Sequence, residues 1–345
     1  MFANYSDNAV LAKARSMYGK RLTVGDYNFL LECNSVSDIA DYLKRKPRYE
    51  NILASLSDNE IHRGKLEETL KIRFYGECAT LCRYEITTLS SYFYKYIIGR
   101  AEIEYIMHFL ILLSAHRTDE YIYNIPLYLD KHSQTDIHAL VDVKSYDDFL
   151  RVMKKTPYYN IFKKYEPHDE QIDLPSIENE LYISLYRELF DIIDKQTHGK
   201  EKKELSEIFN SHINLINFDR ILRMKKYYKL DSDQIEDKLL PFGTLTKKQL
   251  GAMLSAGTSR EIFSIMEGTH SGKRFKDLSY AYTGEIPDRV LIKNCKKQIR
   301  FSLYPSIVML SYLFISEREM KNLISIIEGV RYNISPDTIK SILIL

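Results

Sequence analysis

Three stretches of this chain resemble one another, beginning with Ser35-Val36-Ser37-Asp38-Ile39-Ala40-Asp41-Tyr42-Leu43. The second is Ser145-Tyr146-Asp147-Asp148-Phe149-Leu150-Arg151-Val152-Met153, and the third is Thr258-Ser259-Arg260-Glu261-Ile262-Phe263-Ser264-Ile265-Met266. Each begins with Ser or Thr, has an acid three residues later, and continues with apolar residues at helical spacing. In such a capping box the hydroxyl accepts from the third backbone amide, while the acid reaches back to the cap amide. The sequence therefore predicts three short amphipathic helices.

The three stretches recur at a nearly constant distance. Ser145 follows Ser35 by 110 residues, and Thr258 follows Ser145 by 113. The first two copies also match beyond the helix, where Pro47-Arg48-Tyr49 stands at the position of Pro157-Tyr158-Tyr159. A period of this kind indicates a supersecondary unit that is used three times.

Length and composition favour long helices in a single body. Of the 345 residues, 45% are hydrophobic and 28% are charged, which is ordinary for a globular protein. Glycine (13) and proline (9) are scarce, which favours helices over turn-rich β structure. No low-complexity linker separates the copies. We therefore expect one all-α domain over residues 1–345, with repeats at approximately 1–115, 116–230 and 231–345.

A second element repeats toward the end of the chain. Leu230-Asp231-Ser232-Asp233-Gln234-Ile235 matches Ile334-Ser335-Pro336-Asp337-Thr338-Ile339, which lies 104 residues later, and Thr118 begins a weaker copy. Asp231 and Ser335 are expected to be helix N-caps. Because the chain begins with the back half of a unit and ends with the front half, its two ends are expected to complete each other. This favours a closed ring over an open solenoid.

Charge and cysteine content argue against several classes of protein. With 49 basic and 47 acidic residues, the net charge of +2 gives no support to a nucleic-acid or anionic-membrane partner. Cys33, Cys78, Cys82 and Cys295 are too few and too scattered for a disulfide framework, so we expect free, intracellular thiols. The first residues lack the features of a signal peptide. The longest charge-free run, 301–316, is shorter than the ~20 residues of a membrane span. We expect a soluble or peripheral protein.

The segment Gly268-Thr269-His270-Ser271-Gly272-Lys273-Arg274 is only partly similar to a phosphate-binding loop. A P-loop has four residues between its glycines and a Ser or Thr after its lysine. Here three residues separate the glycines, and Arg274 takes the place of the hydroxyl that would bind Mg²⁺. We therefore predict a solvated loop.

Two further groups of side chains lack the partners that chemistry would need. Cys78 and Cys82 lie one helical turn apart, but a structural zinc site takes two more ligands, so buried thiols in a helix are the simpler interpretation. His132 and His138 flank Asp136 without an evident third partner. We expect no catalytic, cofactor-binding or metal-binding residues.

A basic stretch, residues 220–229, contains five cations and two tyrosines. They are Arg220, Arg223, Lys225, Lys226, Lys229, Tyr227 and Tyr228. This pattern fits a nucleic-acid contact, and it also fits cations that complement the dipole at a helix C-terminus. Since the net charge is close to zero, we favour the second interpretation.

Two helical motifs connect the chain to a known family. Asn217-Phe218-Asp219-Arg220-Ile221-Leu222-Arg223-Met224-Lys225-Lys226-Tyr227-Tyr228-Lys229-Leu230 leads into Leu240-Pro241-Phe242-Gly243-Thr244-Leu245. This stretch resembles the Asn-Leu-x-x-Ile-Leu-Arg-x-Lys helix and the Pro-Gly-Gly-x-Leu loop of the C subunit of bacterial and archaeal V-type (A-type) ATPases, the counterpart of the d subunit of vacuolar ATPases. Residues 319–329 are similar to the family's second Asn-Leu helix, and residues 5–27 are similar to its opening helix.

The chain departs from the family pattern at several positions. Phe242 stands where glycine is common, Phe218 replaces leucine, and Glu328 replaces the arginine of the second helix. In the first unit, the matching helix from Tyr105 to Ala115 lacks the asparagine and the basic residues. These changes bear on individual contact residues and leave the repeat framework intact.

The resemblance implies both a shape and a task. Family members are all-helical funnels of three similar units about a pseudo-threefold axis. They are non-catalytic central-stalk rotor subunits that join the central shaft subunits to the proteolipid ring during ATP-driven or ATP-forming transport of protons or sodium. The implied location is cytoplasmic, peripheral at the membrane through the membrane sector.

Two alternatives remain open at this point. One is a generic helical-repeat scaffold that binds another protein in an open concave groove. The other is a helical enzyme that uses His132 and His138.

Overall fold

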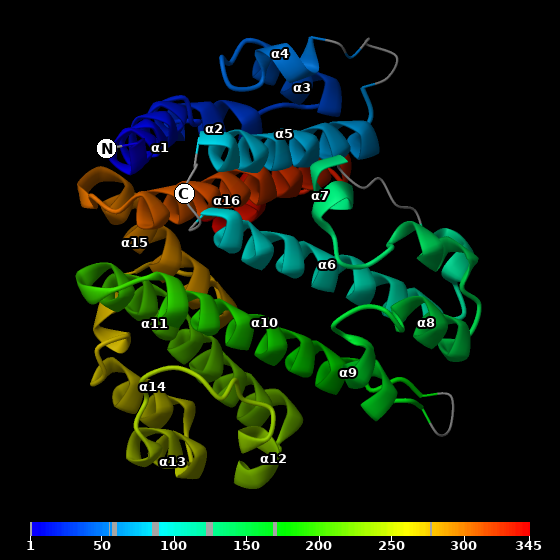
Figure 1. The fold of residues 1–345 in the computed structure, drawn as a ribbon, viewed down its shortest axis with the longest axis vertical. Helices are drawn as coiled ribbons and strands as arrows, with labels where there is room; N and C mark the ends of the chain where they lie inside the picture. The colour runs from blue at the N-terminus through cyan, green and yellow to red at the C-terminus, as the bar shows by residue number, and fades with distance from the viewer. Residues whose placement is uncertain are drawn as a thin grey trace. The chain divides into compact units, whose positions relative to one another are not determined.

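The computed structural model describes residues 2–54, 56, 61–84, 90–121, 127–167, 171–276 and 278–345. Within these ranges the regular elements are helices and helical turns, without a strand (Figure 1). The predicted all-α fold class is therefore confirmed. The chain forms two compact units, which we call unit 1 (Met1–Ser91 and Arg274–Leu345) and unit 2 (Tyr92–Lys273).

Unit 1 is built from both ends of the sequence. Its helices are α1 (Phe2–Gly19), α2 (Val24–Leu31), α3 (Val36–Lys44), α4 (Glu50–Leu53), α5 (Arg63–Tyr84), α15 (Ile286–Phe301), α16 (Pro305–Arg331) and α17 (Pro336–Ile342). The helix α16 packs against α1, α5 and α15 and forms the centre of this unit, as Figure 1 shows.

The central position of α16 follows from its sequence. Pro305 is at the first turn, where the missing N–H costs nothing. Every residue from Ser306 to Ser316 is buried, because neighbouring helices cover this apolar half on all sides. The charge-free run is thus the core of a unit. Among the described residues, none of the helices has the length and apolar character needed to cross a membrane.

Unit 2 contains the middle of the chain. Its elements are α6 (Ser90–Ser114), η2 (Thr118–Glu120), α7 (Leu127–His132), η3 (His138–Asp142), α8 (Tyr146–Met153), α9 (Tyr159–Lys164), α10 (Leu174–Gln196), α11 (Gly199–Arg223), η4 (Met224–Tyr228), α12 (Ser232–Glu236), α13 (Lys247–Ser255) and α14 (Ser259–Glu267). Aromatic rings fill part of its core: Phe149 lies 5.9 Å from Phe109 and 4.8 Å from Phe162 between ring centroids. These rings bury large areas in fixed geometries and hold α8 and α9 against α6.

Candidate functional site

The three capped helices begin where the sequence predicts. The helices α3, α8 and α14 follow Ser35, Ser145 and Thr258, and each hydroxyl accepts a hydrogen bond from the backbone N–H three residues later. At Thr258 the Glu261 carboxylate also accepts from the cap amide, so this capping box is complete. The predicted short helices are confirmed at all three positions.

Thirteen residues after each cap, a side chain binds a polar group on one of the long helices. The three pairs are Arg48 with Glu319 on α16, Tyr158 with Glu102 on α6, and Ser271 with Asn214 on α11. We call these pairs junction 1, junction 2 and junction 3. Each junction lies within one unit, and each joins the segment after a capped helix to a long helix.

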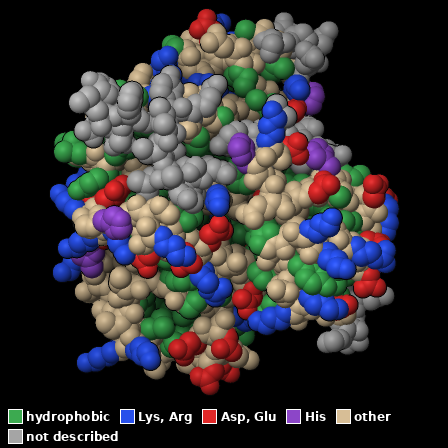
Figure 2. Space-filling view, viewed as in Figure 1, with side chains coloured by type: hydrophobic (Ala, Val, Ile, Leu, Met, Phe, Trp, Pro, Cys, Tyr) green, Lys and Arg blue, Asp and Glu red, His purple; other side chains and the backbone are tan. Residues whose placement is uncertain are grey.

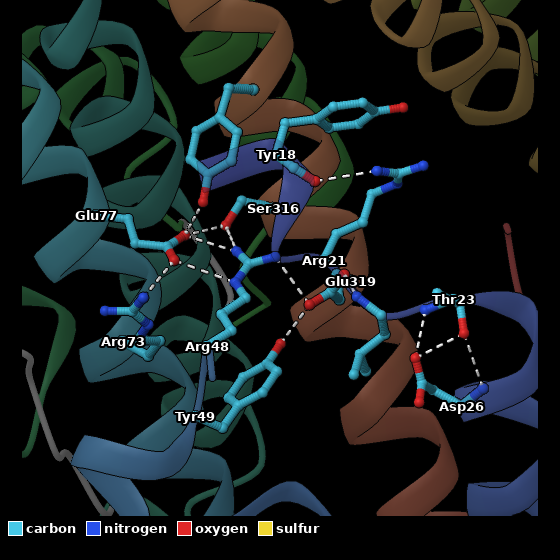
Figure 3. A network of polar contacts seen from close by, with 12 residues as sticks. Tyr18, Arg21, Thr23, Asp26, Arg48, Tyr49, Arg73, Glu77, Ser316 and Glu319 are labelled. Carbon is cyan, nitrogen blue, oxygen red and sulfur yellow. Dashed lines mark hydrogen bonds and ion pairs between the residues drawn. The ribbon is translucent and has the colours of Figure 1, made fainter. Parts of the chain in front are cut away.

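Junction 1 is a buried ionic network in unit 1 (Figure 3). Arg48 donates to Glu319 at 2.8 Å and to both oxygens of Glu77, at 3.1 and 2.6 Å. The Tyr49 hydroxyl donates to Glu319 at 2.6 Å, and the second Glu319 oxygen accepts from the backbone N–H of Leu22 at 3.0 Å. Both carboxylates and the guanidinium are buried, so hydrogen bonds from the protein replace the lost water.

Opposite charges favour the ionised forms of Glu77 and Arg48 in junction 1. Burial raises the pKa of Glu77, but the neighbouring Arg48 and Arg73 outweigh this effect and hold the pKa below its usual value. Burial lowers the pKa of Arg48, whereas Glu319 and the other groups around it raise the pKa well above its usual value. The network is thus suited to a permanent tie between helices, because the charges of Glu77 and Arg48 stabilise each other in a buried place.

Junction 2 satisfies a buried carboxylate with neutral donors. The Tyr158 hydroxyl donates to one oxygen of Glu102 at 2.7 Å. The other oxygen accepts from the Ser133 hydroxyl at 2.6 Å and from the backbone N–H groups of Gln134 and Thr135. Four donors therefore hold this side chain, which is completely buried.

Junction 3 uses an amide in place of an acid. The Asn214 side chain donates to Ser271 at 3.0 Å and to the Thr244 hydroxyl at 2.9 Å, and it accepts from the backbone N–H groups of Thr244 and Leu245. Gly243 has φ +106°, and a Cβ on it would lie 2.2 Å from the Asn214 oxygen. Only glycine fits this turn.

The three junctions share a second contact. In each, the long-helix side chain accepts from the backbone N–H of one residue, and the side chain of the next residue accepts from the N–H three positions later. The donors are Leu22, Thr135 and Leu245, and the residues that follow them are Thr23, Asp136 and Thr246. Glu102, Asn214 and Glu319 therefore hold the same place in three copies of one arrangement, although they lie 112 and 105 residues apart.

Two of the long helices carry a second tie one turn beyond the junction. Asn217 exchanges two hydrogen bonds of 2.9 Å with the backbone of Leu240. Asn322 makes the same pair of bonds to Ile344, at 2.8 and 3.2 Å. On α6 the equivalent position is Tyr105, in agreement with the missing asparagine in the first copy.

The segment from Gly268 to Arg274 is partly buried, so the prediction of a solvated loop is wrong for three of its residues, although His270 is exposed. Thr269, Ser271 and Gly272 are buried, and the Thr269 hydroxyl donates to the Met266 carbonyl at 2.7 Å. A Cβ on Gly272 would lie 1.8 Å from the Met266 oxygen. Gly272 allows the backbone to pass close to the end of α14, and Ser271 takes part in junction 3.

The cysteines and histidines occupy separate places. The four cysteines, all within the described ranges, form no disulfide, as expected; Cys78 is buried on α5, and burial raises the pKa of Cys295 to about 12. His132 ends α7, and His138 lies 3.0 Å from Asp130. Across the described ranges, no three His, Cys, Asp or Glu side chains are grouped so that they could hold a metal ion.

Part of the basic stretch takes part in packing. Arg220 donates to the Asn179 side chain at 2.6 Å and to the Lys238 carbonyl at 2.8 Å. Lys225 donates to the Ala256 carbonyl at 2.9 Å. These two cations therefore bind neighbouring segments of the chain, and these contacts leave the interpretation of the stretch as cations at a helix dipole a prediction. On the face that Figure 2 displays, basic and acidic side chains are interspersed.

Comparison with known proteins gives the family. The profile of the family described as ATP synthase (C/AC39) subunit matches residues 10–342. The chain belongs to this family. The resemblance to the C subunit of V-type and A-type ATPases, inferred from the Asn217 and Asn322 helices, is thereby confirmed.

Curated relatives of this C/AC39 chain are all named as the C subunit of an A-type ATP synthase. The protein from Pyrococcus furiosus is 27% identical over 213 residues, which span 60% of this chain and 56% of that protein. The protein from Desulfurococcus sp. is 21% identical over 338 residues, or 96% of this chain and 88% of the relative. That of Thermococcus kodakarensis is 23% identical over 341 residues, with 95% and 88% covered. The first of these alignments spans little more than half of the relative.

The sequence of this C/AC39 protein places Arg48 and Tyr158 at matching positions of the repeat but does not indicate their junction partners. A single acid such as Glu102, between buried Ala101 and Ile103, was a usable signal, because a charged residue inside an apolar helix face needs a buried partner. Arg48 alone binds Glu77, 29 residues away in the sequence, and Glu319, 271 residues away. Short-range patterns therefore do not predict these pairs.

Proposed function

We propose that this protein is the non-catalytic central-stalk subunit that joins the shaft to the proteolipid ring in a rotary V-type (A-type) ATPase. The observation that carries the proposal is the family match over residues 10–342. Its partners would be the central shaft subunits and the proteolipid ring, and its place would be the cytoplasmic side of the membrane sector. An adaptor in this position transmits torque, which requires a stiff body with close-packed helices.

The junctions support the proposal of a closed body of three repeats about a pseudo-threefold axis. With repeats at approximately 1–115, 116–230 and 231–345, each long helix is tied to the short helices of the next repeat. Glu102 of the first binds Tyr158 of the second, Asn214 of the second binds Ser271 of the third, and Glu319 of the third binds Arg48 of the first. An open solenoid leaves its last link unmade, so this cyclic order favours the funnel over an extended scaffold.

The chemistry of the junctions agrees with a mechanical part. The buried carboxylates are engaged by arginine, hydroxyl and backbone donors that hold helices together. A pairing of this kind rigidifies and specifies a unique packing.

The test removes this chain from the assembled ATPase. The complex is purified with and without the protein and reconstituted into vesicles, and ATP hydrolysis and ion uptake are measured together. We expect hydrolysis to continue while ion uptake is lost, and uptake to return when the purified chain is added back. If the depleted complex pumps ions as well as the intact one, the proposed function is wrong.

A further inference from the structure

Three residues of the described chain other than glycine have a left-handed backbone conformation. They are His116 (φ 54°), Lys229 (φ 53°) and Asn333 (φ 53°), and each lies two residues before Thr118, Asp231 or Ser335. Each one ends a long helix, after α6, after η4 at the end of α11, and after α16. The left-handed turn is a common way to end a helix, and it closes with a characteristic backbone hydrogen bond.

The closing hydrogen bonds differ in the number of residues that they span. They run from Arg117 N–H to the Leu112 carbonyl, from Ile334 N–H to the Gly329 carbonyl, and from Leu230 N–H to the Met224 carbonyl. The first two span five residues and the third spans six. The second copy therefore holds one more residue than the other two.

The extra residue is confirmed by a second measure along the sequence. The left-handed residue follows the junction residue by 14 positions in α6 and α16, from Glu102 to His116 and from Glu319 to Asn333. In the second copy, Lys229 follows Asn214 by 15 positions. A helix that takes up one added residue widens locally into a π-turn, and η4 (Met224–Tyr228) is such a turn.

The end of the π-turn and the left-handed residue after it form four consecutive exposed residues, Lys226-Tyr227-Tyr228-Lys229, which we call the knob. Tyr227 is 67% exposed and Tyr228 is 65% exposed, and the Lys226 ammonium lies 5.0 Å from the centre of the Tyr227 ring. The bond from Lys225 to the Ala256 carbonyl fixes the base of the knob. The fold does not need the added residue, since the same helix end is closed without it in the other two copies.

We propose that the knob docks on an acidic segment of a neighbouring protein of the rotary ATPase, an inference that rests on the proposed function. Tyrosine buries a large surface at a contact for little loss of side-chain entropy, and its hydroxyl meets polar rims. Lys226 and Lys229 flank the two rings and complement carboxylates on the partner. A membrane is the less suitable occupant, because electrostatic binding to anionic lipid relies on clusters of about four to eight basic residues. Arg220 and Lys225 of the basic stretch are held by contacts within the chain, which leaves fewer cations than such a cluster has.

The experiment measures rebinding of the full-length chain to ATPase complex that has been depleted of it. The first variant lacks Tyr227, which restores the length found in the other two copies and removes one ring. The second is Lys226→Glu with Lys229→Glu. Matched controls are Tyr332→Ala and Arg331→Glu, at the equivalent end of α16, where Tyr332 is 61% exposed. Thermal melts and circular dichroism check that each variant folds.

We expect both knob variants to bind the depleted complex at least tenfold more weakly, with unchanged melting temperature, and the controls to bind normally. Added salt should weaken the unaltered chain more than the lysine variant. Normal rebinding of the knob variants would overturn the docking proposal alone. So would knob-dependent binding to vesicles of anionic phospholipid without rebinding loss at the complex. Failure of the unaltered chain to rebind would overturn the proposed function, and this inference with it.

Discussion

The position thirteen residues after each capping residue is filled by three different residues, and each one suits the side chain that it binds on the long helix. Arg48 meets a carboxylate, Tyr158 meets a carboxylate, and Ser271 meets an amide. A buried acid without a strong donor would cost several kcal/mol, so the two halves of each junction have to suit one another. The position is therefore defined by its contact rather than by its residue type.

Replacing Arg48 should test how much junction 1 contributes. In Arg48→Met, Glu77 and Glu319 lose their shared cation in a buried place, and we expect a loss of about 3–5 kcal/mol in the free energy of unfolding. Urea denaturation of the full-length chain measures it. Arg48 helps to hold the pKa of Glu77 below its usual value of 4.5, so this part of the difference is present above pH 4.5 and should be lost as the pH falls below it and Glu77 takes up a proton.

A matched control for this variant is available in the same unit. Arg63 pairs with Glu67 and Glu328 near the surface, where solvent screens the charges. Arg63→Met is expected to cost at most about 1 kcal/mol. Equal losses in the two variants would show that the buried network has no special weight.

At the scale of elements, N-caps fix where the short helices α3, α8 and α14 begin, and left-handed residues fix where the long helices α6, α11 and α16 end. The hydroxyls of Ser35, Ser145 and Thr258 satisfy amides that the first turn leaves without partners. At the C-terminal end of α11, the added residue of the second copy makes the last turn a π-turn, and Asp231 still caps the next helix, α12. A single insertion can thus alter one exposed surface while the packed elements on both sides stay in register.

The complete capping box of α14 gives a prediction at this scale. Thr258→Ala removes the hydroxyl that accepts from Glu261 N–H, and the unfolding free energy is expected to fall by about 1 kcal/mol. Hydrogen exchange of the α14 amides should rise first, since the cap acts on the first turn. Ser259→Ala, one residue later, is the control, and exchange that rises equally in both variants would contradict the role of the cap.

At the scale of the whole molecule, the two ends of the sequence meet in one unit. The helix α17 contacts α2 and α16, and Arg289 donates to the Leu343 carbonyl at 3.0 Å. Ile339 is buried among these helices. The predicted completion of one end by the other is observed in this packing.

Removing residues 335–345 tests this closure. The deletion exposes the surfaces that Ile339, Leu343 and Ile344 cover, each worth roughly 1.5–3 kcal/mol, and it leaves Asn322 without its backbone partner. We expect a lower melting temperature and weaker rebinding to the depleted ATPase complex. Relative to the unaltered protein, hydrogen exchange should increase more in α2 than in α11 of unit 2. Exchange that rises equally in both helices would argue against a local role.

The sequence by itself determined the helical class, the three caps and the family, because each of these depends on short-range patterns. Ser35, Ser145 and Thr258 act on amides three residues away, so their role can be read from the order of residues. The junctions were decided only by the tertiary structure. Glu319 and Arg48 are 271 residues apart, and neither residue specifies its partner until packing removes water from both. The extra residue at the knob belongs to the same class, since it becomes visible only when three helix ends are compared by their closing hydrogen bonds.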